Sequence, residues 1–225
     1  MNQPPILYSF RRCPYAMRAR MALLVSETTC ELREVKLSDK PAELIELSPK
    51  ATVPVLLAPD GRIVDQSIDI MHWALRRNDP ENWLESTADP LIAANDGPFK
   101  HHLDRYKYPS RHDSDPAEHR SAAVEMLADL ENRLWKSANL SRETRSLADI
   151  AIMPFIRQFA NTDRRFFDAL PLPKLQHWLA THIASPLFGT MMIPYEVWCN
   201  HRHPATFLGI DPRTASQQPS SPDQI

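Results

Sequence analysis

The chain has 225 residues and a formal net charge of −2, from 26 basic and 28 acidic side chains. This near balance argues against a nucleic-acid-binding protein, because such proteins bind mainly by neutralising phosphates with lysine and arginine. The four glycines are dispersed, which excludes the clustered glycines of nucleotide-binding turns, whereas 21 prolines indicate frequent helix ends and stiff loops.

Strand and helix patterns alternate over the first 78 residues. Apolar runs predict strands at residues 6–10, 30–37, 53–57 and 62–64, and helical patterns occupy residues 14–24, 41–47 and 68–75. Pro14 is expected at the first helical position, which makes Cys13 the N-cap of that helix, and Ser67 is the expected N-cap of the third helix. The order βαβαββα predicts an α/β domain over residues 1–78.

Helical patterns dominate the rest of the chain. Residues 79–90 carry prolines and no helical periodicity, so we interpret them as a linker. Further helices are expected at residues 91–108, 117–138, 147–153 and 173–184. Ser146, with Asp149 three residues later, predicts a capping box. We therefore expect an all-α domain over residues 91–203, followed by a flexible tail over residues 204–225 that is rich in proline, serine, glutamine and aspartate.

The three cysteines are widely spaced and odd in number. That pattern favours free thiols in a reducing compartment over a disulfide framework. The chain has no run of about 18 apolar residues, and its N-terminus lacks the pattern of a signal peptide. We therefore expect a cytoplasmic protein that does not enter a membrane.

Cys13 is the candidate reactive group. A cysteine at a helix N-terminus faces unpaired backbone N–H groups and the positive end of the helix dipole, and both favour the thiolate. No acidic residue precedes Glu27, so the local charge is positive. The surrounding arginines are Arg11, Arg12, Arg18 and Arg20. The alternative is a small buried hydrophobe, the commonest role of a lone cysteine.

Four segments stand in a distinctive order and spacing. Residues 12–18 read RCPYAMR, residues 52–56 read TVPVL, residues 65–67 read DQS, and the capping box lies at residues 146–149. Together they resemble the glutathione transferase superfamily, specifically its cysteine-type members of the omega-like, beta-like or glutaredoxin-like bacterial kind. The resemblance covers nearly the whole chain before the tail, and it implies a thioredoxin-like N-terminal domain joined to an all-α C-terminal domain.

The resemblance also implies a glutathione site. Cys13 would be the thiol that forms a mixed disulfide with glutathione or attacks one. Val53, before Pro54, would pair its main chain with the cysteinyl part of glutathione, and that proline is cis in the family. Ser67 would hold the γ-glutamyl carboxylate with its hydroxyl and its helix N-terminal amide; its simpler role is that of a helix cap.

Three further positions affect the chemistry and the ligand contacts expected at this glutathione site. Ala16 replaces the second cysteine of the two-cysteine redox motif, so a monothiol cycle resolved by a second glutathione is expected. Gln66 stands where many relatives carry glutamate, so its contact with the ligand's ammonium would be a neutral hydrogen bond, weaker than a charge-assisted one. Lys40 is placed to meet the glycine carboxylate, although an exposed lysine is more often solvated.

A second-substrate pocket is expected from Tyr15 and from the aromatic and basic stretch at residues 99–108, in particular Tyr106. That stretch fits an aromatic core with a solvated charged face equally well. His201 and His203 make a poor metal site, because they are two residues apart and lack nearby acids. We therefore expect no metal and no nucleotide, with glutathione as the co-substrate.

The sequence thus predicts a glutathione-dependent transferase or thiol-disulfide oxidoreductase that uses Cys13 on a mixed disulfide or a small electrophile. Conjugation of glutathione to electrophiles, with Tyr8 or Ser9 stabilising the thiolate, is the enzymatic alternative. The non-enzymatic alternative is a protein of the same fold that has no catalytic activity and binds partner proteins. The resemblance implies a homodimer, although the cysteine-type branches include monomers, and no nucleic-acid or membrane partner is expected.

Overall fold

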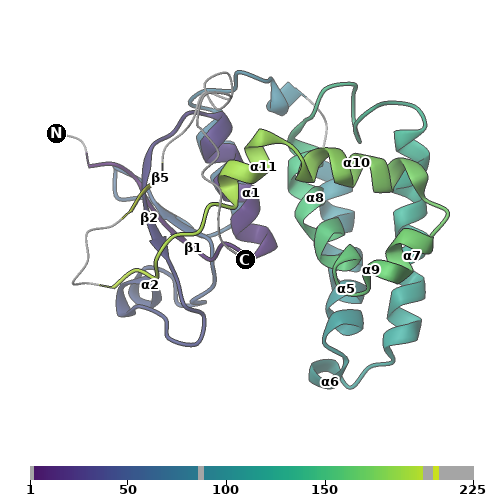
Figure 1. The fold of residues 1–225 in the computed structure, drawn as a ribbon. Coiled ribbons are helices and arrows are strands. Elements are labelled where there is room, and N and C mark those ends of the chain that lie inside the picture. Colours follow the sequence, from purple (N-terminus) through teal and green to yellow (C-terminus); the bar gives the residue numbers. More distant parts are fainter. Residues whose placement is uncertain (1–2, 86–88, 200–204, 208–225) are drawn as a thin grey trace, which may run out of the picture. The chain divides into compact units, whose positions relative to one another are not determined.

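The computed structural model describes residues 3–85, 89–199 and 205–207. The chain forms two compact units, drawn in Figure 1. The first runs to Pro80 and includes the described residues from Pro186 onward, and the second runs from Glu81 to Ser185. The predicted combination of an α/β domain with a helical domain is confirmed.

Within the described residues, the first unit is centred on a five-stranded mixed sheet. Its strands are β1 (Ile6–Ser9), β2 (Cys30–Glu34), β3 (Val55–Leu57), β4 (Ile63–Val64) and β5 (Ala205–Phe207). They lie in the order β4-β3-β1-β2-β5, with β1 parallel to β2 and the other pairs antiparallel. β1 is the central strand, and the loop that follows it leads to Cys13.

The helices of this unit surround a buried first helix. They are α1 (Pro14–Val25), α2 (Ala42–Leu47), α3 (Ser67–Leu75) and α11 (Pro186–Met191). Every residue of α1 except Tyr15 is buried. A helix whose apolar residues occur on all sides needs neighbours on all sides. Accordingly, α1 packs against α3 and against α11, which lies beside it in Figure 1.

The charge of Arg20, on α1, is buried together with its counter-ion. Arg20 donates to the Ser9 hydroxyl over 2.8 Å and forms an ion pair with Glu34, whose side chain is 9% exposed. Burial lowers the pKa of Arg20, and the Glu34 carboxylate opposes that effect. Glu34 also accepts a hydrogen bond from the Arg11 amide over 2.8 Å. This pair joins α1 to β1, to β2 and to the loop before Cys13.

The chain returns to the first unit after Ser185. The Met191 carbonyl accepts a hydrogen bond from Arg20 over 3.4 Å, and the Trp198 amide donates to the Glu34 carbonyl over 2.9 Å. The expected helical domain at residues 91–203 therefore extends too far, because its last described part is bonded to the sheet unit.

The expected tail at residues 204–225 contains a strand where it is described. Ala205–Phe207 pair with β2, whose edge would otherwise present unpaired backbone groups. Composition alone does not reveal this strand, because its three residues acquire a partner only from the folded sheet. The remainder of the expected tail, residue 204 and residues 208–225, lies outside the described residues.

The second unit is built from helices. They are η1 (Trp83–Glu85), α4 (Asp89–Ala94), η2 (Asn95–Phe99), α5 (Lys100–Lys107), α6 (Pro109–His112), α7 (Pro116–Leu134), α8 (Leu147–Ala160), α9 (Arg164–Ala169) and α10 (Pro173–Ile183). η2 is a π-helical segment that contains Pro98. Proline has no amide to donate to the preceding turn, which accounts for the wider turn between α4 and α5. None of the described helices has both the length and the apolar character to cross a membrane.

The predicted capping box begins α8. The Ser146 amide and hydroxyl donate to one oxygen of Asp149 over 2.9 and 2.7 Å. The other oxygen accepts from the Leu140 amide over 2.8 Å and from the Trp178 indole over 3.0 Å. The fully buried carboxylate is therefore well hydrogen-bonded, and it connects the start of α8 to the preceding loop and to α10.

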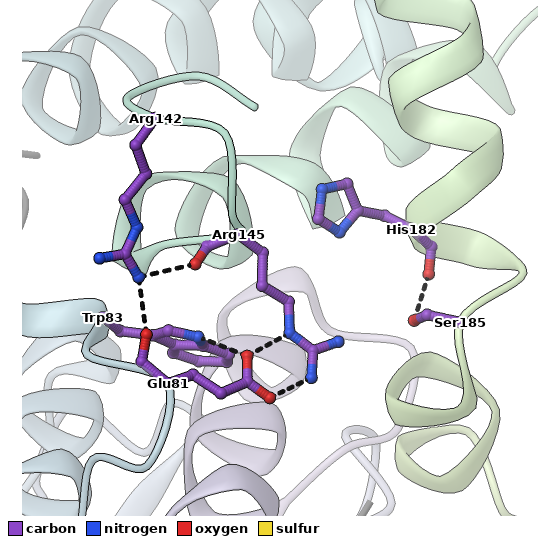
Figure 2. Close-up of polar contacts among 6 residues, drawn as sticks. All are labelled: Glu81, Trp83, Arg142, Arg145, His182 and Ser185. Atoms are coloured by element: carbon purple, nitrogen blue, oxygen red, sulfur yellow. Dashed lines mark hydrogen bonds and ion pairs between the residues drawn. The ribbon is translucent and has the colours of Figure 1, made fainter. Parts of the chain in front are cut away.

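Where it is described, the expected linker at residues 79–90 is anchored structure, and residues 86–88 lie outside the described residues. Figure 2 shows the Glu81 carboxylate paired with Arg145 and accepting from the Trp83 indole over 2.9 Å. The Glu81 carbonyl accepts from Arg142 over 2.7 Å. Burial acts to raise the pKa of Glu81, but the hydrogen bonds and charge of Arg145 outweigh it and lower that pKa. The segment is anchored because fully buried Trp83 belongs to the helical core.

We expect the Glu34→Gln substitution to destabilise the first unit by about 3–5 kcal/mol, because it leaves the buried Arg20 charge without its counter-ion. Urea unfolding followed by circular dichroism measures the loss. Glu31→Gln, on the same strand, is the matched control, because Glu31 and its partner Arg33 are both partly exposed. Its expected loss is about 1 kcal/mol or less. Equal losses in the two variants would contradict the special role of the buried pair.

Candidate active site around Cys13

Cys13 is the N-cap of α1, as predicted. Its backbone is extended, with φ −76° and ψ 122°, and Pro14 takes the first helical position. The Cys13 amide donates to the Phe10 carbonyl over 2.9 Å, which closes the loop between β1 and α1. The side chain is half-buried. The thiol therefore lies where the amides of a helix start are unpaired, and it remains partly accessible.

The thiol contacts a main-chain carbonyl of a distant loop. Cys13 Sγ donates to the Val53 carbonyl oxygen over 3.5 Å. The Val53–Pro54 peptide bond is cis, the isomer that the family resemblance implied. Val53 is buried in a cluster with Tyr8 and Val55, and Cys13 packs against this cluster. The structure thus brings Cys13 together with two of the predicted ligand-binding residues.

The four arginines predicted to surround Cys13 have two different environments. Arg11 and Arg12 lie in the loop before it; Arg12 is exposed and Arg11 is half-buried. Arg18 and Arg20 are fully buried and donate hydrogen bonds to groups in the core. Two of the four positive charges are therefore used for packing α1 in the first unit.

Ser67 is the first residue of α3, and Gln66 is the N-cap. The prediction of Ser67 as the N-cap is therefore wrong by one residue. Gln66 has the extended backbone of an N-cap, and Ser67 is already helical. Arg18 donates from Nη1 to Ser67 Oγ over 3.5 Å, and both side chains are buried. This contact ties the start of α3 to α1. Gln66 is exposed, and its side chain makes no cap hydrogen bond.

Asp65 holds a neighbouring loop against the same helix start. Its carboxylate accepts from Ser48 Oγ over 3.3 Å and pairs with Lys50 Nζ over 3.2 Å. Lys50 is 60% exposed, so the ammonium still faces solvent. Sequence reasoning did not select Lys50, because nothing in the sequence indicates that its loop folds onto Asp65.

Lys40 and Tyr15 lie elsewhere in the first unit. Lys40 is half-buried and immediately precedes Pro41, the N-cap of α2. Tyr15 is half-buried in the first turn of α1, where the Arg18 guanidinium lies 5.5 Å from its ring centre. Tyr15 therefore follows Cys13 closely along the chain and presents part of its ring to solvent.

Tyr106 belongs to the core of the helical unit. It is 9% exposed, and its ring centre lies 5.4 Å from that of Phe159. Burial raises the pKa of Tyr106, and a hydrogen bond from Arg120 opposes that effect. For this residue the environment favours the aromatic-core interpretation of the stretch at residues 99–108.

The hydroxyls of Tyr8 and Ser9 are occupied in the core. Tyr8 is 1% exposed and accepts a hydrogen bond from Arg33. Burial raises the pKa of Tyr8, while Arg33 acts to lower it. Ser9 is fully buried and accepts from Arg20. Neither hydroxyl is open to a substrate in this arrangement.

The three cysteines, all within the described residues, are not in disulfides and differ in accessibility. Cys13 is half-buried, Cys30 is buried and Cys199 is exposed. Burial raises the pKa of Cys30 to about 12. His201 and His203, which the sequence offered as a weak metal pair, lie outside the described residues.

Two family models match most of the chain. The one described as "Glutathione S-transferase, N-terminal domain" matches residues 7–83, and the one described as "Glutathione S-transferase, C-terminal domain" matches residues 96–181. Among curated proteins, a probable glutathione S-transferase of Nicotiana tabacum is 24% identical over 192 residues, covering 80% of this chain and 85% of the tobacco protein. A probable glutathione transferase of Aplysia californica is 29% identical over 92 residues, covering 41% of this chain and 97% of that protein.

Solved structures share the fold. The Tau class glutathione S-transferase of mango, Mangifera indica, matches with a TM-score of 0.70 at 22% identity, covering 86% of this chain and 94% of that chain. A glutathione transferase family member from Pseudomonas fluorescens, with two glutathione bound, matches with a TM-score of 0.69 at 20% identity, covering 86% of this chain and 95% of that chain.

We expect Cys30 to resist alkylation in the folded protein at pH 8, because it is fully buried and its pKa of about 12 keeps it protonated. Iodoacetamide labelling followed by peptide mass spectrometry should modify Cys13 and Cys199 first. The same reaction in urea is the control, in which all three cysteines should react. Labelling of Cys30 at the rate of Cys199 without denaturant would contradict this burial.

Proposed function

Because this chain belongs to the glutathione S-transferase family, we propose that it is a cysteine-type, glutathione-dependent thiol transferase whose nucleophile is Cys13. The observation that carries the proposal is the position of the thiol. It is half-buried at the N-terminus of α1 and 3.5 Å from the Val53 carbonyl. A cysteine at a helix N-terminus is favoured as a thiolate, which is the reactive form.

Glutathione binding in this proposal uses both backbone groups and side chains. The main chain of Val53, before cis Pro54, pairs with the cysteinyl part of the tripeptide. The start of α3 binds the γ-glutamyl carboxylate through the Ser67 amide and hydroxyl, because a helix N-terminus favours an anion. Exposed Gln66 meets the ammonium, and Lys40 meets the glycine carboxylate. A relative from Pseudomonas fluorescens, which was solved with two glutathione bound, supports glutathione as the ligand class.

The proposed cycle has two exchange steps. The Cys13 thiolate attacks the glutathione sulfur of a mixed disulfide, the old S–S bond breaks, and the released thiolate takes up a proton. A second glutathione thiolate then attacks the glutathione sulfur of the Cys13 mixed disulfide, which forms glutathione disulfide and restores Cys13. The residue at position 16 is Ala16, so an internal disulfide across the first helical turn is unavailable.

The hydrogen bond from the Cys13 thiol to the Val53 carbonyl is lost when Cys13 is deprotonated or forms a disulfide. A thiol donates to the carbonyl, whereas a thiolate or a disulfide sulfur has no proton to donate. Once Cys13 reacts, the Val53 carbonyl is therefore free to accept from a backbone amide of the bound tripeptide. The thiol form of Cys13 and the bound tripeptide therefore use the same carbonyl oxygen in turn.

Conjugation to electrophiles has less support from this site. A conjugating enzyme of this fold uses a hydroxyl to stabilise the thiolate of bound glutathione. Here the nearest candidates, Tyr8 and Ser9, are buried and already hydrogen-bonded. Among the two predicted wall residues, partly exposed Tyr15 suits a second-substrate contact better than the core residue Tyr106.

The cellular setting follows from the same chemistry. Free thiols and a glutathione-driven cycle suit a reducing compartment, so we place the protein in the cytoplasm. Membership of the family supports a homodimer, which size-exclusion chromatography with light scattering would distinguish from a monomer.

We expect Cys13→Ser to lower kcat/KM for reduction of a glutathionyl mixed disulfide by about a thousandfold or more, because a seryl hydroxyl cannot form the disulfide intermediate. The assay follows glutathione disulfide with a coupled reductase. Cys199→Ser is the matched control, since it removes an exposed thiol of the same unit and should leave the rate unchanged. Full activity of Cys13→Ser, or conjugation of an aryl halide as the sole activity, would contradict the proposal.

We expect Ser67→Ala to raise the Kd for glutathione about 10- to 100-fold, because a hydrogen bond to a charged carboxylate contributes about 1.5–3 kcal/mol. Isothermal titration calorimetry on the Cys13→Ser background measures binding without chemistry. Ser26→Ala is the control for a buried serine in the same unit. An unchanged Kd in a folded Ser67→Ala variant would assign Ser67 to the helix start alone.

A further inference from the structure

Three histidines from two helices meet in the helical unit. His101 and His102 are adjacent in α5, and His119 lies in the first turn of α7. One ring nitrogen from each lies within 4.8 Å of the other two. The Nδ1 atoms of His102 and His119 are 2.8 Å apart, and the three ring centres are 5.1–5.6 Å apart. We call this group the three-histidine cluster.

The scaffold beneath the cluster is well fixed. α5 and α7 pack against each other. Ser114 Oγ donates to the Arg105 carbonyl over 3.2 Å, which ties the turn before α7 to α5. The Asp115 side chain caps α7 by accepting from the Ala117 amide over 2.8 Å. The Asp115 cap and the hydrogen bond of Ser114 therefore fix the position of His119 relative to α5.

We propose that the three-histidine cluster binds a divalent late first-row transition ion, Zn²⁺, Ni²⁺ or Cu²⁺, through one nitrogen of each ring. Imidazole is a preferred ligand of these ions. A metal–nitrogen distance of about 2.0–2.1 Å places tetrahedral ligand atoms about 3.4 Å apart. The Nδ1 atoms of His102 and His119 are 2.8 Å apart, and one nitrogen of each of the three rings lies within 4.8 Å of the other two, so the separations are of this order. In the proposed site a water molecule takes the fourth position.

The protonation of the rings suits a metal ligand. Two Nδ1 atoms 2.8 Å apart must share one proton, so the His102 and His119 rings cannot both be protonated at that contact. Neutral imidazole is the form that binds a metal. The shared proton is the one that a metal ion would replace.

The surrounding charges select against other cations. Arg105 acts on both α5 histidines, whereas the Glu118 carboxylate acts on His102 in the opposite sense. The site therefore attracts a metal by its nitrogen donors and not by net negative charge. Mg²⁺ and Ca²⁺ prefer oxygen ligands, so they should not compete.

The test is a Zn²⁺ titration of the full chain, without an affinity tag, against a chromogenic chelator. Cys13→Ser and Cys199→Ser are included in all proteins, because accessible thiols also bind zinc. We expect one Zn²⁺ per chain, unaffected by excess Mg²⁺. His101→Gln and His119→Gln should each weaken binding by about tenfold or more. His101 is exposed, so its substitution leaves folding intact and keeps the test valid.

His177→Gln, an exposed histidine on α10, is the matched control and should bind as tightly as the parent protein. Electron paramagnetic resonance of bound Cu²⁺ gives an independent readout and should report three imidazole nitrogens. Binding that survives both cluster substitutions would overturn the proposal. So would binding that is lost in His201→Gln or His203→Gln while the cluster variants bind normally, or the absence of stoichiometric binding.

Discussion

The buried ion pair of Arg20 and Glu34 is the interaction on which the sheet unit depends. Two opposite charges are stable in a protein core only when each has its partner and its remaining hydrogen bonds. Glu34 uses one oxygen for Arg20 and the other for the Arg11 amide. The carboxylate that neutralises α1 therefore also holds the loop that carries Cys13. Arg20 extends the same network to Ser9 on β1 and to α11, so the returning chain is tied to it as well.

The position of Cys13 depends on that network. With the loop held by Glu34, Cys13 takes the N-cap of α1 and meets the Val53 carbonyl. The arginines then divide into two kinds. Arg18 and Arg20 stabilise the packing of the helix, whereas Arg11 and Arg12 lie in the loop before it. A largely buried helix that carries charged groups holds its N-cap in a fixed position, provided that every buried charge keeps its partner.

In the helical unit, too, two buried or partly buried carboxylates have hydrogen-bond partners for both of their oxygens. Asp149 satisfies both carboxylate oxygens with amides, a hydroxyl and an indole, and Glu81 does so with Arg145 and Trp83. Both networks hold segments that lack regular structure, the loop before α8 and the entry to the unit. The three-histidine cluster differs, since the rings of His102 and His119 share a proton with each other. Three imidazole rings that meet in this way form a set of donor atoms that a metal ion can complete.

Local patterns in the sequence were enough to predict most of the elements of the sheet unit and the place of Cys13 at a helix start. Periodicity, Pro14 and the Ser146 capping box act over a few residues, so they identified the strands β1 to β4, the starts of α1 and α8, and Cys13 as an N-cap. The contact of Cys13 with Val53, the pairing of Lys50 with Asp65, and the meeting of His119 with α5 join residues far apart in the chain. The return of α11 and β5 to the sheet is of the same kind, because an edge strand and a buried arginine acquire these partners only when the chain has folded. Local propensity acts between neighbours in sequence, whereas burial and charge pairing act between neighbours in space, and only the tertiary structure decides which residues those are.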